Sequence, residues 1–120
     1  MRKISECNCN HEKVGIVNIP NDEVLDKMTI ILKIAGDKTR LKILYSLLAG
    51  SKCVCEIQED ICASQSLVSH QLKILRNNNL VKTIKKGNHV FYSLSDAHVV
   101  ALLSLVHEHA TEDKSYEEGL

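Results

Sequence analysis

The chain has 120 residues and no formal net charge at pH 7, with 44% hydrophobic and 25% charged residues. This length suffices for one domain with a modest core, and we expect no second, catalytic domain. It has no run of eighteen apolar residues, and Met1–Asn10 is too polar for a signal peptide, so we expect a soluble, cytoplasmic protein. In that reducing compartment the five cysteines favour metal binding or redox sensing over structural disulfides.

The first 20 residues differ in character from the rest of the chain. They lack helical or strand periodicity, contain Cys7, Cys9 and His11, and end at the only proline, Pro20. We therefore expect an N-terminal arm over residues 1–20 that carries metal-binding cysteines.

Apolar residues at helical spacing predict four helices after the arm. Polar N-cap residues and glycines mark most of the expected ends. The expected helices are 22–36 with Asn21 as N-cap, 38–50 with Asp37 as N-cap and Gly50 as the stop, 54–61, and 65–78 with Ser64 as N-cap. The second of them is expected to bury Leu41, Ile43, Leu44, Leu47 and Leu48.

A hairpin and a last helix follow. Two strand-like runs, 81–85 and 89–94, flank Gly87-Asn88, which is a typical hairpin turn, and a helical pattern covers 96–112. Two short helices before a basic hairpin predict a winged helix-turn-helix, a mainly α (α+β) fold whose second helix enters the DNA major groove. We accordingly expect one DNA-binding and dimerisation domain, 21–112, and an acidic tail, 113–120.

The basic residues are concentrated around this predicted reading helix and wing. Residues 61–95 contain no Asp or Glu and five Lys or Arg, so they carry a charge of +5 in a neutral chain. A solvated helix with an ordinary basic patch is the simpler interpretation, but the adjacent hairpin favours contact with DNA. The candidate DNA-binding residues are Ser64, Gln65, Ser66, Ser69, His70, Gln71, Lys73, Lys85, Lys86 and Asn88.

Four residues of metal-ligand type, Asp96, His98, His109 and Glu112, lie in the last helix. Eleven residues separate the two histidines, which places them about 20° apart on one face but about 16 Å apart along the axis. One zinc-type ion needs ligands within about 2 Å, so one helix cannot close this site. Antiparallel pairing of two copies in a homodimer would create two four-ligand sites. The alternative interpretation is an amphipathic helix whose histidine and acidic side chains simply face solvent. His107, half a turn away, should not take part.

Two Cys-x-Cys pairs, Cys7 with Cys9 and Cys53 with Cys55, can combine into a four-thiolate site. Polarisable thiolates suit Cd²⁺ and Pb²⁺ and also bind Zn²⁺. The alternative is that cysteines are small core residues, which suits Cys62 best because it has no nearby partner.

The run SQSLVSHQLKILRNNNLVKTIKKGNHVFYSL, followed by DAHVVALL and His109-x-x-Glu112, resembles the ArsR/SmtB family of metal-responsive winged-helix repressors over about residues 24–112. CVCEI at 53–57, with the cysteine-bearing arm, is more like the CadC branch, which responds to cadmium, lead and zinc. The resemblance implies a homodimer without organic cofactor. By this resemblance, the metal-free homodimer would bind operator DNA. Binding of Cd(II), Pb(II) or Zn(II) would release the homodimer from the operator and derepress a metal efflux or resistance operon.

The resemblance also implies two intersubunit metal sites. Cys53 and Cys55 match a thiolate pair that is completed by arm cysteines of the other protomer, and the four ligand-type residues of the last helix match a carboxylate/imidazole site. The arm cysteines here are spaced more closely than is common in the CadC branch. Either Cys9 or His11 could therefore complete the thiolate site.

Other classes of protein explain fewer of these features. A redox-sensing winged-helix regulator could use Cys53, Cys55 and the arm cysteines, but it leaves the ligand set of the last helix unexplained. A zinc enzyme needs an open coordination position and a pocket, and the sequence shows no nucleophile or general-base motif, so we expect no enzyme. A metal-storage protein would not need the basic hairpin.

Overall fold

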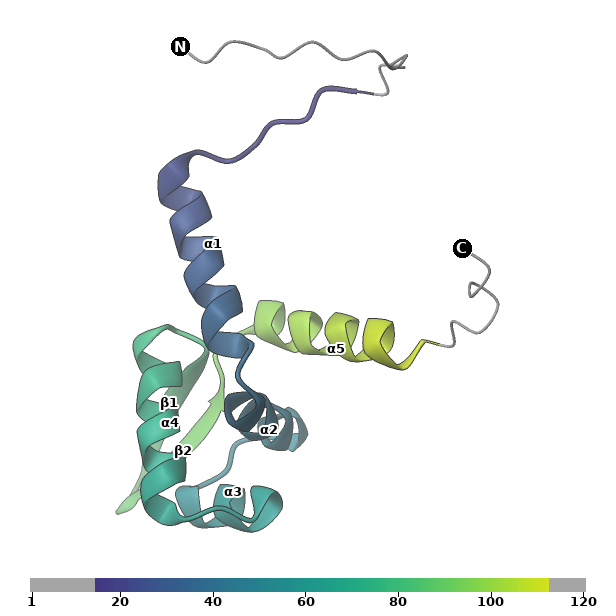
Figure 1. Ribbon diagram of the computed structural model, residues 1–120. Coiled ribbons are helices and arrows are strands. Elements are labelled where there is room, and N and C mark those ends of the chain that lie inside the picture. The colour runs from purple at the N-terminus through teal and green to yellow at the C-terminus, as the bar shows by residue number, and fades with distance from the viewer. Residues whose placement is uncertain (1–14, 113–120) are drawn as a thin grey trace.

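A computed structural model describes residues 15–112 of the chain (Figure 1). Cys7, Cys9, His11 and the acidic tail lie outside this range. The elements are α1 (Asp22–Ala35), α2 (Lys38–Ser46), the 3₁₀ turn η1 (Leu47–Ala49), α3 (Val54–Ile61), α4 (Gln65–Asn77), β1 (Val81–Lys86), β2 (His89–Leu94) and α5 (Ala97–Thr111). The predicted winged helix-turn-helix is confirmed. No helix in this range has the length and apolar character needed to cross a membrane.

The predicted capping residues set the starts of three helices. Side-chain oxygens of Asn21, Asp37 and Ser64 accept hydrogen bonds from backbone N–H groups three residues later, at 3.0, 3.0 and 3.2 Å. These bonds satisfy donors that a helix N-terminus otherwise leaves unpaired.

The second helix departs from its prediction at its C-terminal end. The α-helix stops at Ser46, and the tighter turn η1 leads to Gly50, whose φ of 137° ends the helical path. Because a 3₁₀ turn has about three residues per turn instead of 3.6, Leu48 rotates off the inner face and is 38% exposed. The expectation that Leu48 is a core residue was therefore wrong, whereas Ile43, Leu44 and Leu47 are buried as predicted.

The core lies between α2, α3, α4 and the base of the hairpin. In Figure 1 these three helices gather into one body, while α1 and α5 leave it in different directions. The inner stripe of α4 consists of Val68, Leu72 and Leu75, which recur at i, i+4 and i+7 and are fully buried, as helical periodicity predicts. The buried core residues are Ala35, Ile43, Leu44, Leu47, Ile57, Val68, Leu72, Leu75, Leu80, Val81, Leu94, Val99 and Leu103.

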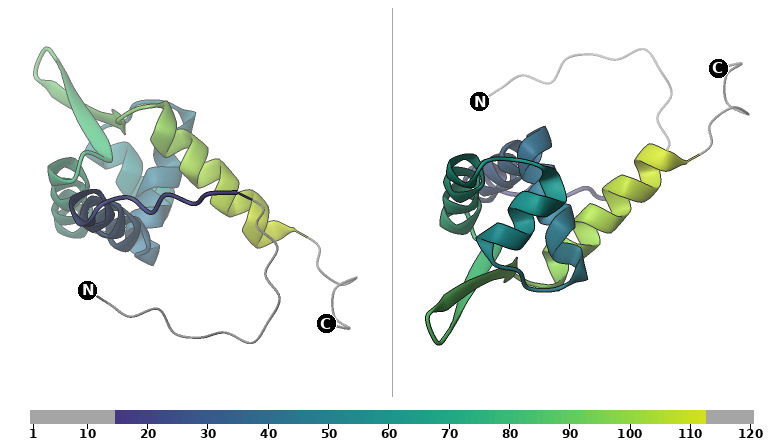
Figure 2. Two further views of the ribbon diagram at one scale, coloured as in Figure 1. Left: turned by 90° about the horizontal axis from the view of Figure 1, so that it is seen from above. Right: turned by 90° about the horizontal axis from the view of Figure 1, so that it is seen from below.

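The wing is an antiparallel hairpin that projects from this body (Figure 2). Its register runs from Val81 opposite Leu94 to Lys86 opposite His89, and Gly87 turns the chain at a φ of 63°. A third segment joins its base, because backbone N–H and C=O groups of Lys52 and Tyr92 exchange hydrogen bonds of 2.9 and 2.8 Å. This bridge ties the residue before Cys53 directly to β2.

α5 is held by few contacts within its own chain. Val99 and Leu103 are its only buried residues, and the Tyr45 hydroxyl of α2 donates a 2.7 Å hydrogen bond to the Leu103 carbonyl oxygen. Large apolar side chains of α1 and α5 remain exposed, namely Val24, Met28, Ile30, Ile31, Leu32, Val100, Leu105 and Val106.

Candidate nucleic-acid interface and metal-binding residues

The outward side of α4 presents hydrogen-bonding and basic groups. Its predicted DNA contacts Gln65, Ser66, Ser69, His70 and Lys73 are all exposed. Ser64, the N-cap, is also exposed, and its hydroxyl lies 3.5 Å from that of Ser66. The backbone of α4 is thus fixed by buried side chains, while a row of polar groups remains available to DNA.

Gln71 is placed differently from the other candidates. It is half-buried, and its Oε1 accepts a 2.9 Å hydrogen bond from Nη1 of Arg40 in α2. The side-chain oxygen of Gln71 is therefore already engaged in a hydrogen bond within the domain.

The tip of the wing carries the other predicted DNA contacts. Lys85, Lys86 and Asn88 are exposed. The Lys86 ammonium lies 5.8 Å from the ring centroid of Phe91, a cation–π distance, and the ring of His89 lies 6.4 Å from the same ring. These contacts cover part of the apolar wing surface and leave both lysines able to meet phosphates.

Asp96 and His98 lie together at the start of α5. Asp96 is the N-cap, and its Oδ1 accepts hydrogen bonds from the backbone N–H groups of His98 and Val99 at 2.9 and 3.2 Å. The backbone N–H of Val99, followed by that of His98, holds the pKa of Asp96 below its ordinary value. Oδ2 lies 3.6 Å from Nδ1 of His98, whose side chain is 97% exposed. A charged carboxylate and an accessible imidazole are thus adjacent.

His109 and Glu112 occupy the other end of α5, and both are exposed. Within residues 15–112 no three His, Cys, Asp or Glu side chains come together as a metal-binding cluster. The ring of His107 lies 5.9 Å from that of Tyr45, so His107 faces its own domain.

Cys53 and Cys55 lie at the start of α3 with free thiols, the first half-buried and the second exposed. The backbone N–H of Cys53, which is the N-cap residue, donates a 3.0 Å hydrogen bond to Oε1 of Glu56. That bond is the largest cause of the lowered pKa of Glu56. The backbone of Cys53 is therefore anchored to Glu56, and neither thiol is in a disulfide. Cys7 and Cys9 lie outside the described residues.

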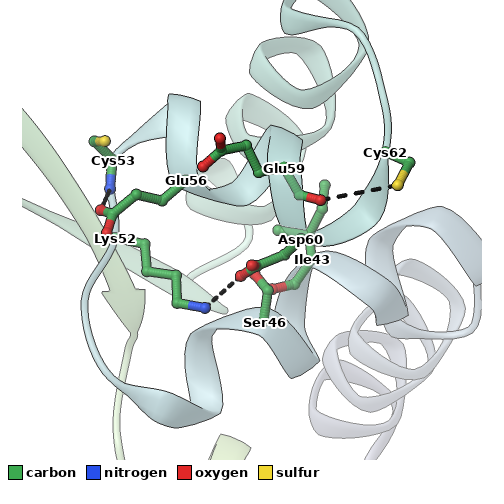
Figure 3. Close-up of polar contacts among 8 residues, drawn as sticks. All are labelled: Ile43, Ser46, Lys52, Cys53, Glu56, Glu59, Asp60 and Cys62. Atoms are coloured by element: carbon green, nitrogen blue, oxygen red, sulfur yellow. Dashed lines mark hydrogen bonds and ion pairs between the residues drawn. The ribbon is translucent and has the colours of Figure 1, made fainter.

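Cys62 ends α3 at the opposite end from Cys53 (Figure 3). It adopts a left-handed conformation with a φ of 55°, its thiol is exposed, and its Sγ lies 3.8 Å from the carbonyl oxygen of Glu59. The interpretation of Cys62 as a core residue was wrong, because the chain reverses here and directs the side chain outward.

Two connections near these residues were not predicted. Arg40 links α2 to both α1 and α4, and Lys52 pairs with Tyr92 through the backbone and forms an ion pair with Asp60. No local sequence pattern marks either one. The capping role of Asp96 could have been predicted, because Asp directly precedes an apolar helical run.

Comparison with known proteins identifies the family to which this winged helix-turn-helix is similar. Residues 37–83 match the model of the bacterial regulatory protein arsR family. A transcriptional repressor SmtB homolog of Synechocystis sp. is 42% identical over 77 residues, which cover 64% of this chain and 58% of the relative. A cadmium resistance transcriptional regulatory protein CadC homolog of Staphylococcus aureus is 40% identical over 83 residues, which cover 68% and 69% of the two chains.

Solved structures support the same architecture. HlyU from Vibrio cholerae is 34% identical, with a TM-score of 0.70 over 77% of this chain and all of that one. A homodimeric winged helix-turn-helix DNA-binding domain from Mycobacterium bovis matches with a TM-score of 0.73 over 84% of this chain and 95% of that one, and its 23% identity supports the fold alone.

Proposed function

The chain belongs to the arsR family of bacterial regulatory proteins, and on this premise we propose that it is a metal-sensing transcriptional repressor. A metal-free homodimer binds operator DNA, and binding of Cd(II), Pb(II) or Zn(II) releases it and derepresses a metal efflux or resistance operon. The family consists of transcriptional regulators rather than enzymes. The names of its relatives refer to cadmium and arsenical resistance, which does not favour the redox alternative.

The acid-free surface formed by α4 and the wing is the observation that carries the proposal. Polar side chains of α4 can hydrogen-bond base edges, while Lys73 and the wing residues Lys85 and Lys86 can neutralise phosphates. A symmetric dimer would present two such surfaces to half-sites about 34 Å apart. Substituting both Lys85 and Lys86 with Glu should abolish operator binding.

The exposed ligand pairs at the two ends of α5 support a metal site between protomers. Asp96 and His98 already lie within 3.6 Å of each other and are accessible. If two α5 helices pack antiparallel, the partner's His109 and Glu112 would complete a four-ligand set. Carboxylate and imidazole ligands favour zinc over the softer ions.

The thiols at the start of α3 support a second site for soft ions. Cys53 and Cys55 would supply two thiolates, and Cys7 with Cys9 or His11 of the partner's arm would supply the rest. Lys52, the residue before Cys53, exchanges two backbone hydrogen bonds with Tyr92 in β2. Ligation at Cys53 can therefore act on the wing of the same protomer through a continuous path.

Release from DNA requires that metal bind the free dimer more tightly than the DNA-bound dimer. By linkage, DNA must then weaken metal binding by the same factor, and such coupling is typically about 1–3 kcal/mol. A shift in the spacing of the two α4 helices supplies this difference, because it spoils contacts in both half-sites together.

The decisive experiment is a metal titration of the protein–operator complex. The operator is first selected from random duplexes with metal-free protein and labelled, and its anisotropy is followed as Cd²⁺, Pb²⁺ or Zn²⁺ is added. Cys53→Ser should lose release by cadmium and lead, whereas His98→Ala should mainly lose release by zinc.

Matched controls separate these sites from other thiols and imidazoles. Cys62→Ser removes an exposed thiol at the other end of α3, and His107→Ala removes an imidazole from α5 that faces Tyr45. Both should respond to metal like the wild type. If neither Cys53→Ser nor His98→Ala alters release by any metal, the site assignments fail.

A further inference from the structure

Arg40 connects three helices through one side chain. It lies in the first turn of α2, its Nε donates a 2.7 Å hydrogen bond to the carbonyl oxygen of Ile34 in the last turn of α1, and its Nη1 donates a 2.9 Å bond to Oε1 of Gln71 in α4. A guanidinium group holds its donors in a rigid plane. The position of α1 and the orientation of the Gln71 amide are therefore fixed by the same group.

The chemistry of arginine determines which end of Gln71 faces inward. Arginine has no hydrogen-bond acceptor, so the Gln71 atom beside it must be the carbonyl oxygen. The amide nitrogen of Gln71 has no hydrogen-bond partner within residues 15–112, and it is not among the buried unpaired polar atoms, which are Ser93 Oγ and Ser95 Oγ. It therefore reaches solvent with two N–H donors and no acceptor beside them.

The place of Gln71 on α4 indicates what those donors meet. At about 100° per residue, Gln71 lies about 60° from the buried residue Val68, whereas His70 lies on the far side of the helix from Val68. Gln71 is thus at the flank of α4, next to the start of α2. The flank of a helix lying in the major groove faces the groove wall, where phosphate oxygens accept hydrogen bonds.

We propose that Arg40 is a positioning residue that holds the Gln71 carbonyl oxygen inward, so that the Gln71 amide nitrogen donates to a phosphate oxygen of the bound DNA. This inference rests on the proposed DNA-binding function. Because Arg40 also binds the Ile34 carbonyl oxygen, the orientation of this donor depends on where α1 lies relative to α2.

The test uses two single variants and the double variant that combines them. Gln71→Met keeps the length of the side chain without its polar atoms. Arg40→Lys keeps the positive charge without the planar guanidinium group. Affinity is measured for metal-free protein on the operator and on an unrelated duplex. Gln71→Met should weaken the affinity for the operator and the affinity for the unrelated duplex by the same factor, about threefold to tenfold. The salt dependence should not change, because glutamine neutralises no phosphate.

The double variant separates positioning from a general structural role. Arg40→Lys should weaken binding by a similar factor alone and add nothing in the Gln71→Met background. A merely structural Arg40 would have the same effect in both backgrounds. The proposal is also overturned if Gln71→Met binds both duplexes like the wild type, or if it weakens only the operator, which would indicate contact with a base.

A further variant keeps the proposal testable if Gln71→Met unfolds. Gln71→Glu retains an oxygen acceptor for Arg40 and should preserve the melting temperature, but it turns a carboxylate oxygen toward phosphate and should weaken DNA binding at least about tenfold. Unchanged affinity would overturn the proposal. Failure of the proposed function differs from all these outcomes, because wild-type protein would then show no preference for any DNA sequence.

Discussion

Leu105 provides a quantitative test of the proposed pairing of α5 helices. It lies about 20° from His98 around the helix axis and is 64% exposed. Full burial of a leucine side chain contributes about 1.5–3 kcal/mol, so covering its exposed part contributes about 1–2 kcal/mol per protomer. Two copies meet in a symmetric dimer. Leu105→Ala should therefore raise the dimer Kd between about 30-fold and 1,000-fold.

Sedimentation across a range of protein concentrations measures this change in dimer Kd. Val100→Ala is the matched control, because Val100 lies on the opposite side of α5 and is 40% exposed. It should leave the dimer Kd within about twofold of the wild type, since a surface substitution of this kind rarely exceeds about 0.5 kcal/mol. An unchanged dimer Kd for Leu105→Ala would refute antiparallel pairing on the His98 face.

Three further substitutions test the fold around the site. Asp37→Ala removes the acceptor for the Arg40 backbone N–H and should lower the unfolding free energy in urea by about 1 kcal/mol, whereas Asp37→Asn should cost much less. Gly87→Ala meets no neighbouring atom but places a side chain at a φ of 63°, so it should cost about 1–2 kcal/mol in thermal unfolding. Tyr45→Phe removes the donor to the Leu103 carbonyl oxygen and should weaken the docking of α5 by about 0.5–1.5 kcal/mol, measured as faster hydrogen exchange in α5. The N-cap role of Asp37 would be contradicted if Asp37→Ala and Asp37→Asn lowered the unfolding free energy equally. An unchanged stability of Gly87→Ala would contradict the need for glycine in the turn, and unchanged hydrogen exchange in Tyr45→Phe would contradict the role of Tyr45 in docking α5.

The parts of the fold that depend on local rules were predictable from the sequence. Asn21, Asp37 and Ser64 set helix starts because a side-chain oxygen can reach backbone N–H groups only a few residues away. Gly87-Asn88 fixed the wing for a similarly local reason, because the turn requires positive φ. The inner stripe of α4 followed from periodicity alone.

The remaining features depend on residues that are distant in sequence. Arg40 meets Gln71 across 31 positions, and Lys52 pairs with Tyr92 in the wing, so no local pattern contains either contact. Gln71 was assigned to DNA by its polarity, but whether its oxygen or its nitrogen is available depends on that distant arginine. The ligand set of α5 is an extreme case, because half of each proposed site comes from another chain.

The two proposed metal sites should act on DNA through different parts of the protomer. Cys53 follows Lys52, whose two backbone hydrogen bonds with Tyr92 are each worth about 0.5–1.5 kcal/mol net. Distorting this bridge alone would supply the typical coupling of about 1–3 kcal/mol. α5 follows β2 after Ser95 and contacts that strand, but its docking in its own chain rests on two buried side chains and one Tyr45 hydrogen bond. We therefore expect ligands on α5 to act mainly by changing how the two protomers are placed. Soft ions bound by thiolates would then move the wing within a protomer, whereas zinc at α5 would change the spacing of the two α4 helices.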